Sequence, residues 1–139
     1  MERVIALLSE KNTYLEKFYF LNEQELINFG EGNFETVEPF YHARDKILDL
    51  ISCLDGLLDE ENKRMPAEIT NSQKIEVGDL LRAKDELVKA ILAQDLQLLA
   101  YIEKEKSNII RDLRGSTQAR RAVGAYGNTE RMKELDEKP

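Results

Sequence analysis

The chain has 139 residues, of which 42% are hydrophobic and 34% are charged, and its formal net charge is −7. This is the length of one domain, and the high share of charged residues favours a slim helical bundle over a compact globule. The acidic balance argues against a nucleic-acid-binding protein, and no apolar run approaches the roughly 20 residues that span a bilayer, which excludes membrane insertion. The single cysteine, Cys53, and an N-terminus without the pattern of a secretion signal lead us to expect a soluble, cytoplasmic protein.

The first predicted helix spans about residues 2–29. Its apolar residues mostly recur at steps of three or four, which is the spacing of one helix face, and no proline interrupts them. Gly30 and Gly32 then predict a helix stop, and we expect Asn33 to be the N-cap of the next helix. The apolar positions are Val4, Ile5, Leu8, Leu15, Phe18, Tyr19, Leu26 and Phe29.

The second predicted helix spans about residues 34–62, with Pro39 near its start, where a missing amide donor costs least. The third, about residues 72–113, is the longest. Its apolar residues recur at gaps near 3.5 over several turns, which indicates a coiled-coil-like seam. They are Leu80, Leu81, Leu87, Val88, Ile91, Leu92, Leu98, Leu99, Ile102, Ile109, Ile110 and Leu113.

We expect Gly115 to end the third helix, since residues 116–139 hold too few apolar anchors to become ordered on their own. Two interpretations of this tail remain open: a dispensable segment, or one that folds against a partner through residues near Tyr126. The predicted fold is therefore all-α. It is an elongated antiparallel bundle or hairpin of three long helices over residues 1–115, with a flexible C-terminal tail over residues 116–139.

No arrangement of residues indicates catalysis. The one histidine, His42, lies 11 residues from Cys53, roughly 16 Å along a helix, so the two cannot form a local nucleophile–base pair. A zinc site needs three or four suitably spaced ligands, which one histidine and one cysteine cannot supply. We therefore expect no enzyme, no catalytic residue, no metal and no cofactor. We interpret Cys53 as a small core residue.

The third helix instead offers a surface for another helix. The first two helices carry enough apolar surface to cover its seam up to about Leu98, which leaves the C-terminal part of the seam uncovered. We predict that this uncovered part binds a partner. The predicted partner-binding residues are Leu98, Leu99, Ile102, Ile109, Ile110, Leu113 and Tyr126.

Several local patterns carry a family resemblance. They are Glu23-Gln24-Glu25, Gly32-Asn33-Phe34-Glu35, Arg44-Asp45-Lys46-Ile47-Leu48 with Leu54-Asp55, and Ala93-Gln94-Asp95-Leu96 with Ile102-Glu103-Lys104-Glu105-Lys106. With the layout of two helices, one long helix and a tail, the chain resembles the FlgN family of bacterial flagellar export chaperones and, less closely, the FliT type.

This resemblance spans most of residues 1–115 and rests on helical patterns rather than on a catalytic signature. It implies a cytoplasmic chaperone that grips the C-terminal amphipathic helix of flagellar hook–filament junction subunits. The chaperone would prevent their premature assembly and deliver them to the type III export apparatus. In this sequence the gripping region would be residues 98–113, with the tail around Tyr126.

Two other functions remain open: a homo-oligomeric coiled-coil scaffold, and an adaptor or regulator that sequesters another factor. A self-associating coil is expected to keep apolar residues in register, whereas Lys84, Asp95 and Lys106 interrupt this seam. A homodimer is therefore an alternative to a helical protein client. We expect no nucleic-acid partner.

Overall fold

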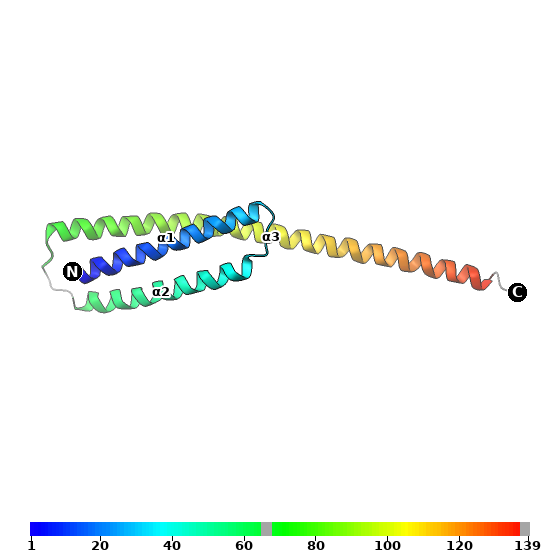
Figure 1. Ribbon diagram of the computed structural model, residues 1–139, viewed down its shortest axis with the longest axis horizontal. Helices are drawn as coiled ribbons and strands as arrows, with labels where there is room; N and C mark the ends of the chain where they lie inside the picture. Colours follow the sequence, from blue (N-terminus) through cyan, green and yellow to red (C-terminus); the bar gives the residue numbers. More distant parts are fainter. Residues whose placement is uncertain (65–67, 137–139) are drawn as a thin grey trace. The chain divides into compact units, whose positions relative to one another are not determined.

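The computed structural model describes residues 1–64 and 68–136, and it describes side chains as far as Gly124. These residues form three α-helices and no strand: α1 (Glu2–Gly30), α2 (Val37–Lys63) and α3 (Asn71–Asp136) (Figure 1). The predicted all-α fold of three long helices is thus confirmed. The expected spans 2–29 and 34–62 agree closely with α1 and α2.

The chain divides into two units, Met1–Tyr101 and Ile102–Pro139, which we call the bundle and the C-terminal unit. The boundary between these units lies after Tyr101, and the division into a helical domain over residues 1–115 and a tail over residues 116–139 stays a prediction. The expected helix end at Gly115 is wrong, because α3 continues to Asp136. A glycine inside a helix costs about 1 kcal/mol relative to alanine, but it ends the helix only where the backbone turns into the left-handed region. Gly32 does so, with φ of 79°.

Within the bundle, α1 packs against both α2 and the first part of α3, which it crosses toward its C-terminal end in the view of Figure 1. Helices α1 and α2 are antiparallel, as shown by the ion pair between Lys11 Nζ and Asp55 Oδ1 at 2.6 Å and by a second pair, Arg3–Glu61, near the N-terminus. Helix α3 runs parallel to α1. Asn12 donates to the carbonyl oxygen of Leu80 at 3.0 Å, and further along Gln94 donates to that of Tyr19 at 3.1 Å. The topology is therefore up-down-up.

Most of the core lies along α1, whose buried residues recur mostly at steps of three and four. One apolar cluster joins Val4, Leu7 and Leu8 to the C-terminal half of α2, and a second joins Leu15 and Phe18 to Ile91 of α3. Each fully buried aliphatic or aromatic side chain stabilises the fold by about 1.5–3 kcal/mol through removal from water. Burial of this one face of α1 thus holds the bundle together.

The turn between α1 and α2 is shaped by Gly32 and Asn33. The side chain of Asn33 accepts a hydrogen bond from the amide of Glu35 at 3.0 Å, and the N-cap of α2 is Thr36. The expectation that Asn33 caps α2 is therefore wrong. Asn33 builds the turn instead, because its short side chain reaches an amide two residues further along.

Two further positions differ from expectation or were missed. Cys53 is exposed on α2, so its interpretation as a core residue is wrong. It lies one position before the buried Leu54. At the start of α3, Thr70 and Gln73 exchange side-chain-to-backbone hydrogen bonds of 3.2 Å in both directions, a capping box that fixes where the helix begins.

Candidate partner-binding surface

Two apolar heptad series run along α3 within the bundle. The inner series packs toward α1 and is buried or half-buried, whereas the outer series, displaced by about one residue, is largely exposed. The inner series consists of Val77, Leu80, Lys84, Leu87, Ile91, Gln94, Leu98 and Tyr101. The outer series consists of Leu81, Asp85, Val88, Leu92, Asp95 and Leu99.

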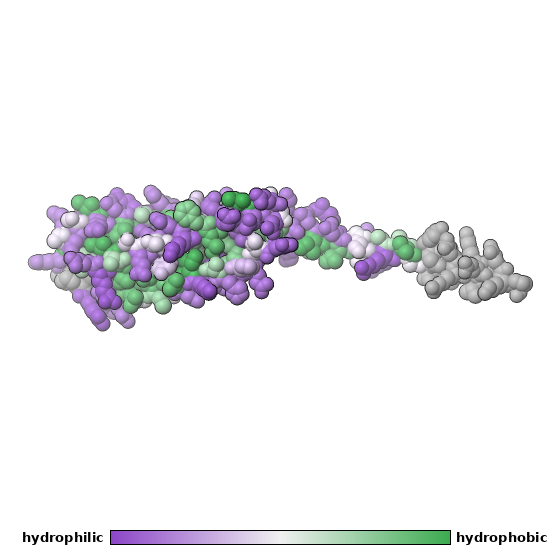
Figure 2. All heavy atoms as spheres, in the orientation of Figure 1, coloured by the Kyte–Doolittle hydropathy of each residue, from purple (hydrophilic) through white to green (hydrophobic). Residues whose placement is uncertain are grey.

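The neighbours Leu98 and Leu99 show the difference most plainly. Leu98 of the inner series is 3% exposed, while Leu99 of the outer series is 54% exposed. A helix that needed only one covered face would place polar residues at most positions like Leu99. The apolar residues of the outer series therefore form a surface that folding of the bundle leaves largely exposed. Figure 2 shows hydrophobic side chains exposed among hydrophilic ones over the bundle.

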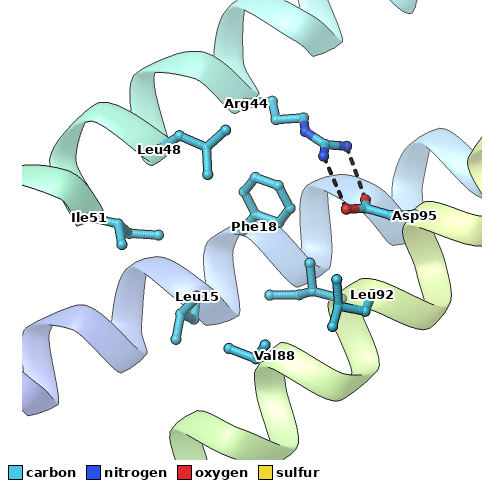
Figure 3. Close-up of a pocket in the computed structure, with 9 residues that line it drawn as sticks. Leu15, Phe18, Arg44, Leu48, Ile51, Val88, Leu92 and Asp95 are labelled. Atoms are coloured by element: carbon cyan, nitrogen blue, oxygen red, sulfur yellow. Dashed lines mark hydrogen bonds and ion pairs between the residues drawn. The ribbon is translucent and has the colours of Figure 1, made fainter.

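Part of the outer series lines a groove between α2 and α3, which we call the α2/α3 groove. Its floor comes from Leu15 and Phe18 of α1, and its hollow has a volume of about 150 Å³ (Figure 3). An apolar cavity of that size accommodates a group as large as benzene. The groove can thus seat one large apolar side chain. Its walls are Leu48 and Ile51 of α2, and Val88, Ile91 and Leu92 of α3, with Arg44 and Asp95 beside them.

An ion pair joins the two walls of this groove. Both terminal nitrogens of Arg44 donate to the two carboxylate oxygens of Asp95, each at 3.0 Å (Figure 3). The guanidinium of Arg44 also lies over the ring of Phe18, 4.8 Å from its centroid. Such a bidentate pair fixes direction as well as distance. Arg44 therefore ties α2 to α3 across the floor of the groove.

A buried polar layer continues from this pair into the bundle. Asn22 is completely buried, and its amide donates to Asp95 at 3.2 Å. Gln94 is also buried and donates to Glu23 at 2.8 Å, and Thr36 donates to the buried Glu25 at 2.6 Å. Polar side chains inside a helical bundle contribute less to stability than to the choice of register. This layer therefore fixes how the three helices align.

In the C-terminal unit, the register of the outer series continues at Ile102, Lys106, Ile109 and Leu113. Ile102 is half-buried, whereas Ile109 and Leu113 are exposed, Leu113 to 62%. Ile110 lies beside them and is exposed as well. This unit thus carries an exposed apolar stripe on one helix.

The predicted site residues fall into three groups. Leu98 is a core residue of the bundle and does not belong to the exposed surface. Leu99 lies on the outer series of the bundle, and the isoleucines and leucine between residues 102 and 113 lie in the C-terminal unit. The side chain of Tyr126 lies outside the described residues. That any of these residues binds a partner stays a prediction.

Sequence reasoning missed the groove, although a signal for it was present. Within the bundle, apolar residues of α3 occur as adjacent doublets, and in each doublet the first residue belongs to the inner series and the second to the outer series. Such doublets at heptad spacing indicate a helix with two apolar faces. The doublets are Leu80-Leu81, Leu87-Val88, Ile91-Leu92 and Leu98-Leu99.

Within the part of the chain that the structure describes, no group of three or more His, Cys, Asp or Glu side chains is placed to hold a metal ion. In the same part of the chain, no helix combines the length and apolar character needed to cross a membrane. Comparison of the chain with protein-family models, with curated proteins and with solved structures found no match.

Proposed function

We propose that this protein is a cytoplasmic chaperone that binds an amphipathic helix of another protein subunit and keeps that helix from assembling too early. The observation that carries this proposal is the outer series of α3, which stays apolar and exposed in the bundle and whose register continues in the C-terminal unit. Large exposed apolar patches on proteins mark sites of interaction with other proteins, with membranes or with ligands.

The mode of binding follows from the chemistry of the stripe. A partner helix with apolar residues at steps of three and four can lay them against Ile109, Ile110 and Leu113 of the C-terminal unit, as in other complexes of amphipathic helices. Each large side chain that becomes fully buried contributes about 1.5–3 kcal/mol, and several such contacts are needed to offset the entropy that is lost on association. The protein would act by masking its client, without any chemical step.

The class of client comes from the resemblance to the FlgN type of flagellar export chaperone. On that basis we propose that the client is the C-terminal helix of a hook–filament junction subunit, which the chaperone carries to the type III export apparatus. One motif behind the resemblance, residues 102–106, lies on α3 in the C-terminal unit, beside the exposed stripe. The client's own helix would otherwise be free to self-assemble.

The test is gel filtration with light scattering of the full chain mixed with junction subunits, with and without their C-terminal helix. We expect a stoichiometric complex with the intact subunit and none with the truncated one. Ile109→Glu should abolish the complex, because a buried carboxylate finds no partner in an apolar contact. Ser107→Glu adds the same charge at another exposed position of the same helix and should leave the complex intact.

Circular dichroism of both variants should match that of the unmodified chain, since Ile109 is exposed. A complex that forms equally well with Ile109→Glu would contradict the proposed surface. A stable homo-oligomer that binds none of the junction subunits would instead favour the alternative function, a coiled-coil scaffold.

A further inference from the structure

The α2/α3 groove is an apolar hollow in a bundle whose overall charge is acidic. Residues 1–101 hold 20 Asp and Glu against 11 Lys and Arg. Asp45 lies one helical turn before Leu48 on α2, so both project from the same side of that helix, and both are exposed. Asp59, also exposed, lies further along α2. A helix that fits this groove therefore needs apolar residues for its floor and basic residues along its edges.

The C-terminal unit is itself such a helix. Residues 102–124 hold six Lys and Arg against three Asp and Glu, the reverse of the balance in the bundle. Their exposed stripe of Ile109, Ile110 and Leu113 lies on the same helix as the exposed Arg114 and Arg121, which line a shallow hollow together with Ile110 and Leu113. Apolar character and charge thus complement the groove.

The length of the outer series in the bundle also agrees with the length of the helix in the C-terminal unit. The outer series from Leu81 to Leu99 extends over roughly 28 Å at 1.5 Å per residue, and residues 102–121 form roughly 30 Å of helix. Leu113 is of the size that the hollow of about 150 Å³ can seat. One additional helix in the groove would turn the three-helix bundle into a four-helix one, with the usual packing around a shared core.

We infer that residues 102–124 of a second copy of this chain occupy the α2/α3 groove. The protein therefore associates with itself through two different surfaces, the groove of one copy and the basic apolar helix of the other. This goes beyond the proposed client binding and does not depend on it, since both surfaces belong to this chain.

The inference predicts a cross-link between two different variants. In a Cys53→Ser background, one preparation carries Leu92→Cys in the groove and the other carries Leu113→Cys. After mixing and treatment with a short bis-maleimide, the cross-linked heterodimer should be the main product. Replacing Leu113→Cys by Ser107→Cys, at an exposed position outside the stripe, is the matched control and should reduce that product at least tenfold.

Light scattering of the full chain over a concentration series provides the second readout. Association should weaken with added salt, because the charges around the groove are exposed and screened. Leu113→Glu should raise the dissociation constant at least about tenfold, since it removes a buried apolar side chain from the contact.

Three results would overturn the inference. The first is a chain that stays monomeric at every concentration. The second is a monomer in which the double variant Leu92→Cys with Leu113→Cys cross-links within one chain, which would make the chain's own segment the occupant. The third is an oligomer in which the mixed variants give no heterodimer above the control. None of these results decides whether the chain binds a client, because the junction-subunit experiment measures that separately.

Discussion

Helix α3 is used differently in the two units of the chain. In the bundle its inner series is mostly apolar and packs against α1, with Ile91 and Leu98 fully buried. Beyond Tyr101 the same register carries Glu105, Asn108, Asp112 and Gly115, none of which can contribute to an apolar core. The outer register, by contrast, keeps apolar residues on both sides of this point.

This difference between the two registers shows which apolar residues of α3 stabilise the bundle and which do not. The inner register becomes polar where the bundle ends, as expected for a helix face that serves only folding. The outer register stays apolar in the C-terminal unit, although the described side chains of that unit are exposed or at most half-buried and form no core. We therefore propose that these apolar residues contact another helix.

The largest effect is expected from the two neighbours at the end of the inner and outer series. Leu98→Ala should lower the free energy of unfolding by about 2–5 kcal/mol, because it leaves a cavity in the core. Leu99→Ala should change it by less than about 1 kcal/mol, since Leu99 is exposed. Urea denaturation of both variants measures the contrast. Equal losses would mean that the two series are not distinct.

A second contrast uses one substitution at two glycines. Gly32→Ala should destabilise the bundle by about 1–2 kcal/mol, because the left-handed backbone at φ of 79° is strained for any residue with a Cβ. Gly115→Ala should instead favour helix by about 1 kcal/mol, as Gly115 lies inside α3 and a Cβ there meets no atom. Urea denaturation measures the loss of stability in Gly32→Ala, and the circular dichroism signal measures the helix content of Gly115→Ala. A loss of helix in Gly115→Ala would show that α3 does end there.

The smallest effect concerns the ion pair across the groove. Arg44→Gln should cost about 1 kcal/mol, because its bidentate pair with Asp95 is partly buried and lies over Phe18. Arg82→Gln, which breaks an exposed pair with Asp79 on one helix turn, should cost no more than about 0.5 kcal/mol. Thermal unfolding at low and high salt compares the two. A larger loss for Arg82→Gln would mean that the groove pair does not tie α2 to α3.

The sequence was sufficient to predict the three helices and the turn between the first two. Steps of three and four in the apolar residues, together with Gly30 and Gly32, set those boundaries. It was not sufficient to separate the two faces of α3, because the adjacent leucines at 98 and 99 give one apolar pattern whichever of them is buried. Their assignment depends on where α1 lies, which is a tertiary contact.

Errors at single positions have the same origin. Cysteine is a small residue that occurs at both buried and exposed positions, so only the packing of α2 on α1 shows that Cys53 is exposed. Gly115 lowers helix propensity without ending α3, since propensity is a weak determinant beside the helical context of its neighbours. The α2/α3 groove is lined by residues of all three helices, so its position depends on how the helices pack.

The central claim is that the outer series of α3 is a surface that another helix covers. It is tested most directly by the rate of maleimide labelling of single cysteines placed in a Cys53→Ser background. Leu99→Cys and Leu113→Cys report on the outer series, while Gln97→Cys and Ser107→Cys report on exposed positions outside it.

Each rate is measured against increasing concentrations of the Cys53→Ser chain, and then of a junction subunit whose C-terminal helix is intact. We predict that labelling on the outer series slows at least tenfold with one or both additions, while the two control positions keep their rates. Unchanged rates at all four positions with both additions, or equal protection of the controls, would contradict the claim.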